Sequence, residues 1–502
     1  METWPPCPVP FNLAAHVLAR AATCADKPAL EVLHPEGADI WSYARLEAAV
    51  RGCGTGLRAL GLPAGARVLM RLGNTPAFPV LYLAAIAVGL VPVPTSAALT
   101  APEITAMAAA IGPALVVGQD GVALPDHPAP VLDAAEILAM SALPPCDYDM
   151  GDPNRLAYVV FTSGTSGKAL AVAHAHRAIW ARGMMREGWQ GLTEADRLLH
   201  AGAFNWTYTL GCGLLDPWVA GATALIPDGS IPSTGLPALL ARHRATIFAA
   251  APGVFRQMLR APMPPLPALR HALSAGEALP EATRSAWEAA TGTLVHQAFG
   301  LSECSTFVSG SPARPAPHGA TGYPQAGRRI AVLDDAGQPA SEGTLAVHQS
   351  DAGLMLGYLD APAQTAARYA GDWFLTGDQV RQDADGAITY LGRHDDLMNA
   401  GGFRVSPIEV ETALARFAGL QEVAVTEVEP TAGTRIIACA YVAAQPIDET
   451  ALAAHAAQNL ARYKQPRTYL RLDALPRNAN NKLNRRALRA ILESALRVPE
   501  SP

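Results

Sequence analysis

The chain has 502 residues, of which 50% are hydrophobic and 16% are charged, and its formal net charge is −6. A single hydrophobic core stops growing at about 250–300 residues, so at least two domains are expected. The composition is that of a globular protein and excludes general disorder. The slight negative charge argues against a general affinity for nucleic acid or for an anionic membrane.

Cysteine usage and the first residues indicate the compartment. The seven cysteines include no C-x-x-C pair, and their odd number favours free thiols in a reducing environment. The opening METWPPCPVPFNL is rich in proline and lacks both a basic start and a continuous apolar run. We therefore expect no signal peptide and a cytoplasmic location.

Apolar runs in the first half alternate between strand-like and helix-like segments. Strands are expected over 66–72, 89–94 and 113–119, with helices over 74–89 and 100–112 between them. The same alternation recurs in 221–227, 236–244, 245–252 and 267–280. Strand–helix–strand order predicts parallel sheets covered by helices on both faces.

Residues 77–99 carry no charge and could suggest a membrane segment. Pro79, Pro92 and Pro94 interrupt the run, which is unfavourable for one continuous spanning helix. A buried helix at about Val80–Val88 followed by a buried strand at about Leu90–Pro94 is expected instead, and no membrane span.

The pattern of residue types changes near residue 395, at a polar, glycine-bearing junction. A helix over 408–417, strands over 423–428 and 435–443, and a helix over 448–461 follow. The expected fold class is α/β, with a large N-terminal domain of helix-covered, mostly parallel sheets over 1–394. A small α+β domain is expected over 395–502.

A loop rich in hydroxyls and glycine is the first chemical signal. The apolar strand Leu156–Phe161 leads into Thr162-Ser163-Gly164-Thr165-Ser166-Gly167-Lys168. Hydroxyls and backbone N–H groups donate to phosphate oxygens, glycine allows close approach, and lysine supplies charge. The spacing is not that of a Walker loop. The alternative is a solvated surface loop.

The segment FTSGTSGK resembles the phosphate loop of the adenylate-forming superfamily, which includes acyl-CoA synthetases. The family usually has Pro-Lys-Gly after the second glycine, whereas Lys168-Ala169-Leu170 stands here. The resemblance implies ATP, Mg²⁺ and coenzyme A as reactants or cofactors, and a small domain that swings about a hinge.

Five further segments resemble family motifs in family order. They are Ser274-Ala275-Gly276-Glu277-Ala278, Phe299-Gly300-Leu301-Ser302-Glu303, Thr376-Gly377-Asp378, Arg393-His394-Asp395, and the C-terminal segment ending in Asn481-Lys482. Taken alone, each segment also has a purely structural interpretation, such as a core position for Phe299, an aspartate at a turn or a solvated basic helix face. Their shared order favours the resemblance.

The resemblance implies a role for each matched residue. Residues 276–278 border adenine, Phe299 packs on it, and Ser302 approaches the α-phosphate. Thr165 and Glu303 hold Mg²⁺, and Lys168 with the loop holds the β- and γ-phosphates. Asp378 and Arg393 contact ribose, and Asp395 is the hinge. Gly401 and Gly402 line the pantetheine tunnel, and Lys482 is the catalytic lysine.

The acid pocket is implied at Asn205, Trp206, Ala275 and Gly300. Acetyl-activating relatives place a tryptophan at the position of Gly300, so an acid longer than two carbons is expected. Amino-acid-activating relatives often place an aspartate at the position of Asn205, and a buried unpaired ammonium would be costly there. We expect an apolar medium-chain or aromatic monocarboxylate.

The expected function is an ATP-dependent acid:CoA ligase that forms acyl-AMP and pyrophosphate, and then acyl-CoA and AMP. A carrier protein in trans is the alternative acceptor. A P-loop-like kinase or ATPase is the alternative of another class, and a non-catalytic nucleotide-binding relative is a third. The histidines show no convincing metal-ligand spacing, and the pair His174 and His176 is expected to be structural or peripheral.

Overall fold

The computed structural model of the protein describes residues 4–162, 170–396, 398–400, 403–431, 434–477 and 483–496. The chain forms two compact units, the larger comprising Met1–Ile330 and Val347–Phe374, and the smaller Ala331–Ala346 and Leu375–Pro502. The chain passes between them within β16 (Ile330–Leu333), β17 (Glu342–His348) and β20 (Trp373–Gln382). The domain boundary expected between residues 394 and 395 lies inside the smaller unit. The hinge expected at Asp395 stays a prediction.

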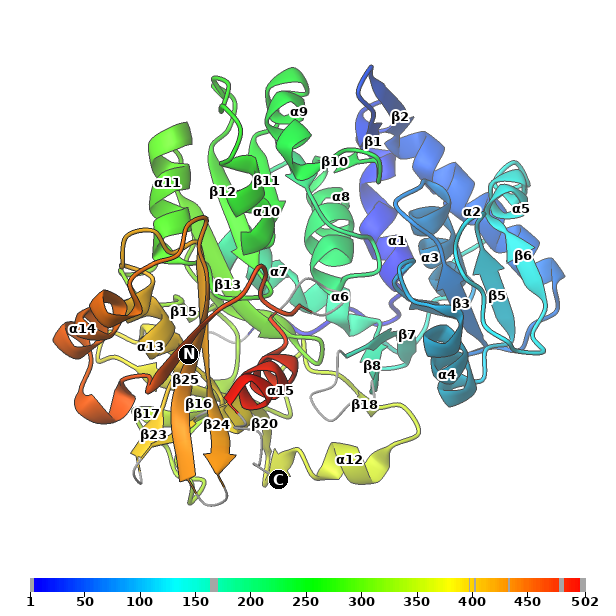
Figure 1. Ribbon diagram of the computed structural model, residues 1–502. Helices are drawn as coiled ribbons and strands as arrows, with labels where there is room; N and C mark the ends of the chain where they lie inside the picture. The colour runs from blue at the N-terminus through cyan, green and yellow to red at the C-terminus, as the bar shows by residue number, and fades with distance from the viewer. Residues whose placement is uncertain are drawn as a thin grey trace. The chain divides into compact units, whose positions relative to one another are not determined.

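The larger unit is built around a nine-stranded sheet of order β15-β14-β13-β12-β11-β9-β10-β1-β2 (Figure 1). Its strands are β1 (Pro28–Leu33), β2 (Ala38–Ser42), β9 (Arg197–His200), β10 (Thr223–Pro227), β11 (Ile247–Ala250), β12 (His271–Ala275), β13 (Val295–Leu301), β14 (Ser305–Ser309) and β15 (Tyr323–Pro324). Strands β1 and β9 to β13 pair in parallel, and both edges are antiparallel. The expected helix-covered, mostly parallel sheet is confirmed.

Helices cover both faces of this sheet. Apolar residues of α9 (Leu236–Arg242), α10 (Pro252–Met258) and α11 (Glu281–Thr291) pack on one face together with Phe248 and Ala272 (Figure 1). The other face is covered by α1 (Leu13–Leu18), α8 (Asp216–Ala220) and the π-helical turns η2 (Arg186–Gln190) and η3 (Thr209–Leu215). The shorter elements nearby are η1 (Ala19–Ala22), α6 (Arg177–Ala181), α7 (Gly183–Met185) and η4 (Ser233–Gly235).

A second sheet in the larger unit has the order β4-β3-β5-β6 and is parallel throughout. Its elements are α2 (Tyr43–Ala59), β3 (Arg67–Arg71), α3 (Ala77–Ala87), β4 (Val91–Pro94), α4 (Ala101–Ile111), β5 (Leu115–Gly118), β6 (Val131–Asp133) and α5 (Ala134–Met140). All of α3 is buried, as the uncharged stretch predicts. Strand β4 tolerates Pro92 and Pro94 because it is an edge strand. Among the described residues, no helix is both long and apolar enough to cross a membrane.

A third, three-stranded sheet of the larger unit has the order β18-β8-β7. It consists of β7 (Leu156–Phe161), β8 (Ala171–Ala175) and β18 (Gly357–Tyr358), followed by α12 (Pro362–Ala366) and β19 (Tyr369–Ala370). Strands β7 and β8 are antiparallel, with Phe161 opposite Ala171. The strand expected before the phosphate loop is therefore present, and it belongs to a hairpin.

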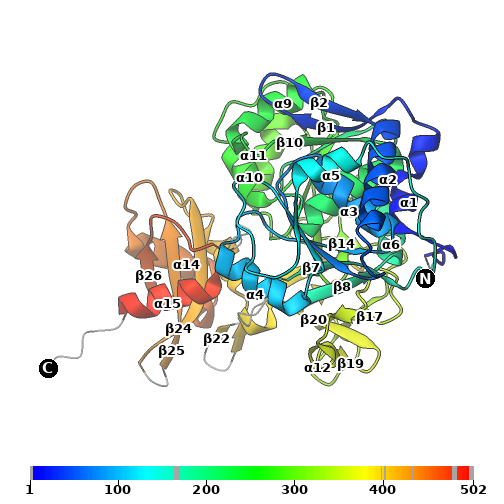
Figure 2. The same cartoon turned by 90° about the vertical axis from the view of Figure 1, so that its right-hand side faces the viewer.

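The smaller unit contains the antiparallel pair of β20 and β21 (Ile388–Arg393), η5 (His394–Asp396), and the hairpin of β22 (Met398–Ala400) and β23 (Phe403–Val405). Its other sheet, β24-β25-β26, is formed by β24 (Glu422–Thr431), β25 (Thr434–Val442) and β26 (Thr468–Arg471). Residues of α13 (Pro407–Leu414) and α14 (Glu449–Asn459) pack on one face, and α15 (Arg485–Leu496) packs on the other (Figure 2). The short turn η6 (Arg462–Lys464) precedes β26.

Candidate functional site

Two of the sequence motifs meet at the carboxyl ends of neighbouring parallel strands. In the register of β12 and β13, Ala275 lies opposite Ala298, so residues 276–278 and 299–303 follow from adjacent strand ends. Ligands of open parallel sheets bind at this edge, outside the carboxyl ends of the strands. The structure therefore brings together the two segments predicted to bind adenine and the α-phosphate. The ring of Phe299 packs edge-on against Phe307, with 5.5 Å between centroids.

Gly300 has a backbone reason to be glycine. A Cβ atom built at this position would collide with the carbonyl oxygen of Ser305 and would lie 2.5 Å from the Cα of Thr306 on β14. The absence of a side chain is thus required by the close approach of the next strand. The backbone of β14 alone therefore explains Gly300, and the larger acid pocket expected from this glycine stays a prediction.

The turn after Gly300 places Ser302 and Glu303. Nε2 of His174, on β8, lies 2.7 Å from the carbonyl oxygen of Ser302. Burial lowers the pKa of His174 to about 4, so its ring is neutral near pH 7 and Nε2–H donates this bond. His174 also stacks on Tyr158 at 4.8 Å. The histidine expected to be structural or peripheral is therefore a positioning residue for the motif turn.

Glu303 is a buried carboxylate, with 8% of its surface exposed. Its Oε1 accepts a hydrogen bond of 2.7 Å from the hydroxyl of Tyr358 on β18. A carboxylate with two oxygens can keep this bond and still offer a ligand atom to a hard cation. The residue thus fits the predicted Mg²⁺ role. The described residues contain no cluster of three or more potential metal-ligating side chains.

The phosphate loop is described only at its two ends. The N–H of Thr162 donates to the carbonyl oxygen of Leu170 at 2.9 Å, and the N–H of Leu170 donates to Oγ1 of Thr162 at 3.3 Å. These bonds continue the hairpin of β7 and β8. The other predicted loop residues, 163–168, lie outside the described residues, as do Gly401, Gly402 and Lys482.

The predicted ribose-binding pair is held together within the smaller unit. Asp378 on β20 lies opposite Arg393 on β21, and Nη1 of Arg393 is 3.6 Å from Oδ2 of Asp378. The hydroxyl of Tyr390 donates to Oδ1 of the same carboxylate at 3.3 Å. Burial, followed by the charge of Asp378, raises the pKa of Tyr390, which keeps the hydroxyl protonated as a donor. The backbone of Asp395 lies in η5, directly after this pair.

The predicted acid-binding residues flank a buried aromatic cluster. Trp206 is half-buried and packs perpendicular to Tyr208, with 5.1 Å between ring centroids. The Tyr208 hydroxyl donates to the carbonyl oxygen of Leu273, two residues before Ala275. Ala275 belongs to the same cluster, and Asn205 directly precedes Trp206. The structure thus brings Trp206 and Ala275 to one cluster.

An ion pair next to this cluster was not anticipated from the sequence. Arg182 and Asp216 are joined by bonds of 2.7 and 2.5 Å, and Nε2 of Gln190 donates to the same carboxylate at 2.6 Å. Nη1 of Arg182 also donates to Ser305 Oγ at 2.7 Å, just beyond the motif turn. The partners are 34 and 123 residues apart, so no local sequence pattern could have found them.

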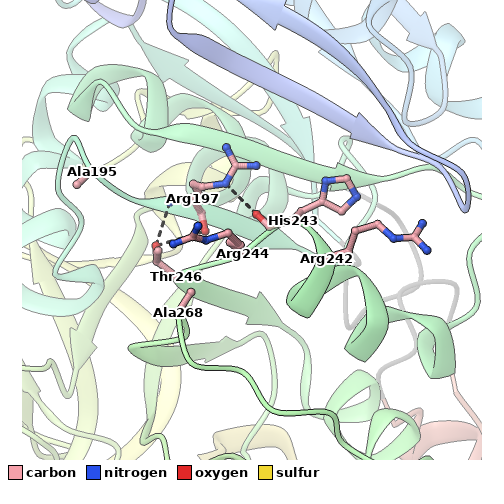
Figure 3. Close-up of a pocket in the computed structure, with 7 residues that line it drawn as sticks. All are labelled: Ala195, Arg197, Arg242, His243, Arg244, Thr246 and Ala268. Atoms are coloured by element: carbon pink, nitrogen blue, oxygen red, sulfur yellow. Dashed lines mark hydrogen bonds between the residues drawn. The ribbon is translucent and has the colours of Figure 1, made fainter.

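A pocket of about 480 Å³ lies elsewhere in the larger unit, at the amino ends of β9 and β11 (Figure 3). Its lining consists of Ala195, Arg197, Arg242, His243, Arg244, Thr246 and Ala268. Arg197 donates to Glu31 and to the carbonyl oxygen of His243, both at 2.8 Å. Because the motif residues follow the carboxyl ends of the strands, this basic pocket is separate from the predicted site.

Two family models match this chain. The model of the AMP-binding enzyme family matches residues 17–359, and the model of the AMP-binding enzyme C-terminal domain matches residues 409–482. The chain belongs to the AMP-binding enzyme family. It is 28% identical over 501 residues to the 3-hydroxybenzoate–CoA ligase of Aromatoleum sp. (strain CIB), and the match covers 94% of each chain.

Other similar proteins extend this result. The chain of this AMP-binding enzyme is 26% identical to the human mitochondrial acyl-coenzyme A synthetase ACSM2A, over 96% of this chain and 91% of that one. The crystal structures of a benzoate CoA ligase from Burkholderia xenovorans LB400 superpose with a TM-score of 0.85 at 27% identity, covering 95% of this chain and all of that one. The enzyme is an AMP-forming acid–thiol ligase that joins an acid to CoA. The alternative of a P-loop-like kinase or ATPase is therefore excluded.

Proposed function

We propose that this AMP-binding enzyme activates an aromatic or medium-chain monocarboxylate as its acyl-adenylate and transfers the acyl group to coenzyme A. The observation that carries the acid class is the cluster formed by Trp206, Tyr208 and Ala275 beside the strand ends that bear the nucleotide motifs. Aromatic and small apolar residues favour an apolar acid. The aryl–CoA ligases among the similar proteins support the aromatic choice.

In the first step a carboxylate oxygen attacks the α-phosphorus of ATP, and pyrophosphate leaves. The transition state gathers negative charge, so catalysis depends on positioning and on positive electrostatics. We assign Thr162 and the following loop with Lys168 to the phosphates, Phe299 to adenine and Asp378 with Arg393 to ribose. Thr165 and Glu303 would hold Mg²⁺, which supplies charge neutralisation at the phosphate oxygens when bound.

In the second step the thiolate of CoA attacks the acyl carbonyl, and AMP leaves. We assign Lys482 to the bridging and carboxylate oxygens in the first step, and Gly401 with Gly402 to the pantetheine passage in the second. The small domain would turn about Asp395 between the steps. Glycine suits a narrow passage because any Cβ atom would obstruct it.

A screen of acids tests the proposal. Pyrophosphate and AMP are measured with acetate, hexanoate, octanoate, benzoate and substituted benzoates, each with and without CoA. We expect AMP and thioester from aromatic or medium-chain acids and little from acetate. Activity confined to acetate or to amino acids would contradict the proposed acid class.

Two variants separate the steps. Lys482→Ala should lower acyl-AMP formation by about 10²–10³-fold, the usual effect of losing one preorganised group, while thioester formation from supplied acyl-AMP continues. Gly402→Leu should release pyrophosphate normally but form little thioester. Equal loss of both steps in Lys482→Ala would remove the two-step assignment.

The acceptor and the compartment complete the proposal. A carrier protein in trans is the second candidate acceptor, and it would require transfer to a phosphopantetheinylated carrier at a rate above that to CoA. All seven cysteines are unpaired, and five are buried. This suits the reducing cytoplasm that we propose as the location.

A further inference from the structure

Two buried polar side chains beside the aromatic cluster of Trp206 and Tyr208 have no hydrogen-bond partner among the described residues. His200 ends β9 and Thr209 begins η3, and both are fully buried, with 0% of their surface exposed. In the part of the chain that the structure describes, neither ring nitrogen of His200 has a hydrogen-bond partner. The same holds for Oγ1 of Thr209. By contrast, His176 and His271 each place a ring nitrogen within 3.0 Å of a backbone partner.

Such groups are costly to leave unbonded. Burial lowers the pKa of His200 to about 3, so its imidazole is neutral near pH 7, with one N–H donor and one bare nitrogen acceptor. Buried polar atoms in folded proteins nearly always have a partner, and those without one call for an explanation such as a ligand or a water. These two neighbouring side chains together offer three atoms that could bond a polar guest.

The two side chains border the same point. A Cβ atom built on Gly202 would collide with Oγ1 of Thr209 and would lie 3.2 Å from Nδ1 of His200. The hydroxyl and the ring edge therefore converge beside Gly202 without bonding each other. Asn74 fixes this loop, because it donates to the carbonyl oxygen of Gly202 at 2.8 Å and accepts from the N–H of Phe204 at 2.9 Å.

This point lies beside the cluster that contains Trp206, Tyr208 and Ala275. The ring of His200 meets Tyr208 edge-on at 4.4 Å, and Tyr208 in turn packs on Trp206. The same cluster contains Ala249, Ala275 and Ala298, which are small residues near the carboxyl ends of β11, β12 and β13. Two aromatic rings, three alanines and one polar pair thus lie together, a chemistry that suits a flat acid with a single polar substituent.

We propose that His200 and Thr209 select a hydroxyl-substituted aromatic acid, an inference that rests on the proposed acid activation. A hydroxyl group both donates and accepts, so it can bond the bare nitrogen or the N–H of His200 together with the hydroxyl of Thr209. An unsubstituted acid would leave these atoms unbonded. A site built to bond a substrate hydroxyl discriminates strongly against the analogue that lacks it.

Matched acids and matched variants test the inference. Pyrophosphate release is measured with benzoate and with 2-, 3- and 4-hydroxybenzoate in the wild type, His200→Phe and Thr209→Val. We expect one hydroxyl isomer to exceed benzoate in kcat/KM by about 10- to 100-fold, the range for one or two buried hydrogen bonds. Both variants should lower this ratio at least 5-fold.

The control is Thr283→Val, which makes the same change at a buried threonine of α11, on the opposite face of the sheet. Its ratio should match the wild type. Equal use of benzoate and all three isomers, or a ratio unchanged in both variants, would overturn the inference and leave the ligase function standing. If no acid of any class releases pyrophosphate, the proposed function itself fails. Should His200→Phe not fold, the isosteric Thr209→Val decides alone.

Discussion

Two buried polar groups lie on either side of the π-helical turn η3 and differ in how they are satisfied. The guanidinium of Arg182 lies against Gly211 and is paired with Asp216, whereas the imidazole of His200 lies against Gly213 and bonds nothing in the described part of the chain. Both need a glycine of the same turn for room. The guanidinium of Arg182 is bonded within the fold and stabilises it. The imidazole of His200 keeps an unbonded donor and an unbonded acceptor, as the proposed recognition of a substrate hydroxyl requires.

Breaking the satisfied group should have the largest effect. Arg182→Leu leaves Asp216, which is 1% exposed, as a buried charge without its cation. Loss of one partner of such a pair typically costs about 3–5 kcal/mol. All eight tryptophans lie in the larger unit, so urea unfolding followed by tryptophan fluorescence reports on it. The double variant Arg182→Leu with Asp216→Leu should recover part of the loss, and a single-variant loss below 1 kcal/mol would show that the pair is dispensable.

An intermediate effect is expected at Glu303. Tyr358→Phe removes the donor 2.7 Å from its Oε1 and leaves the buried carboxylate with one bond fewer. The free energy of unfolding should fall by about 1–3 kcal/mol. Because the hydroxyl also orients the carboxylate, the Mg²⁺ concentration for half-maximal pyrophosphate release should change. Tyr463→Phe, in the smaller unit, is the control, and identical behaviour of the two variants would reject the orienting role.

A smaller effect is expected from an ion pair near the surface. Hydrogen bonds to Asp228, at 2.7 Å, and to Asp39 raise the pKa of His34 above its usual value. Its contribution is therefore fully present below about pH 6.5 and is lost as the pH rises through the folded-state pKa. His34→Gln should cost about 0.2–1 kcal/mol at pH 5.5, as exposed pairs do, and almost nothing at pH 9. A cost that grew with pH would contradict this assignment.

The smallest change in stability is expected at the unsatisfied group. His200→Phe removes no hydrogen bond, so the unfolding free energy of the ligand-free protein should stay within about 1 kcal/mol of the wild type. Repeated with a saturating hydroxyl-substituted acid, the same titration should show less stabilisation of the variant than of the wild type. A loss as large as that of Arg182→Leu would make His200 a structural residue and erase the contrast.

Local patterns were sufficient for much of the fold. The charge-free run of 77–99 predicted the helix α3 and the strand β4, and the apolar run of 156–161 predicted β7. These elements are set by hydrophobic periodicity and by proline positions, which are visible within a dozen residues. Strand β8, by contrast, lies after the phosphate loop and was not anticipated, because its short A-V-A-H-A run has no distinctive period.

Part of the candidate site depends on distant pairs that sequence order conceals. The family motifs predicted that 274–278 and 299–303 belong to one site, and the register of β12 and β13 places them side by side. The contacts of His174 with Ser302 and of Tyr358 with Glu303 join residues 128 and 55 positions apart. The reason for Gly300 was also hidden, since it lies in the backbone of the following strand. Tertiary pairing decides these features.

The helix α3 has a consequence for any attempt to divide the protein. Its eleven residues, AFPVLYLAAIA, are all buried, so the helix has no polar, solvent-exposed face. An isolated segment that contained it would be poorly soluble. Its cover comes from α1, α2 and α5. A nascent chain or a truncated fragment that ends between α3 and α5 would expose this apolar helix. It would be prone to aggregate or to bind chaperones until α5 packs on it. A split-enzyme design should therefore keep residues 13–140 on one piece.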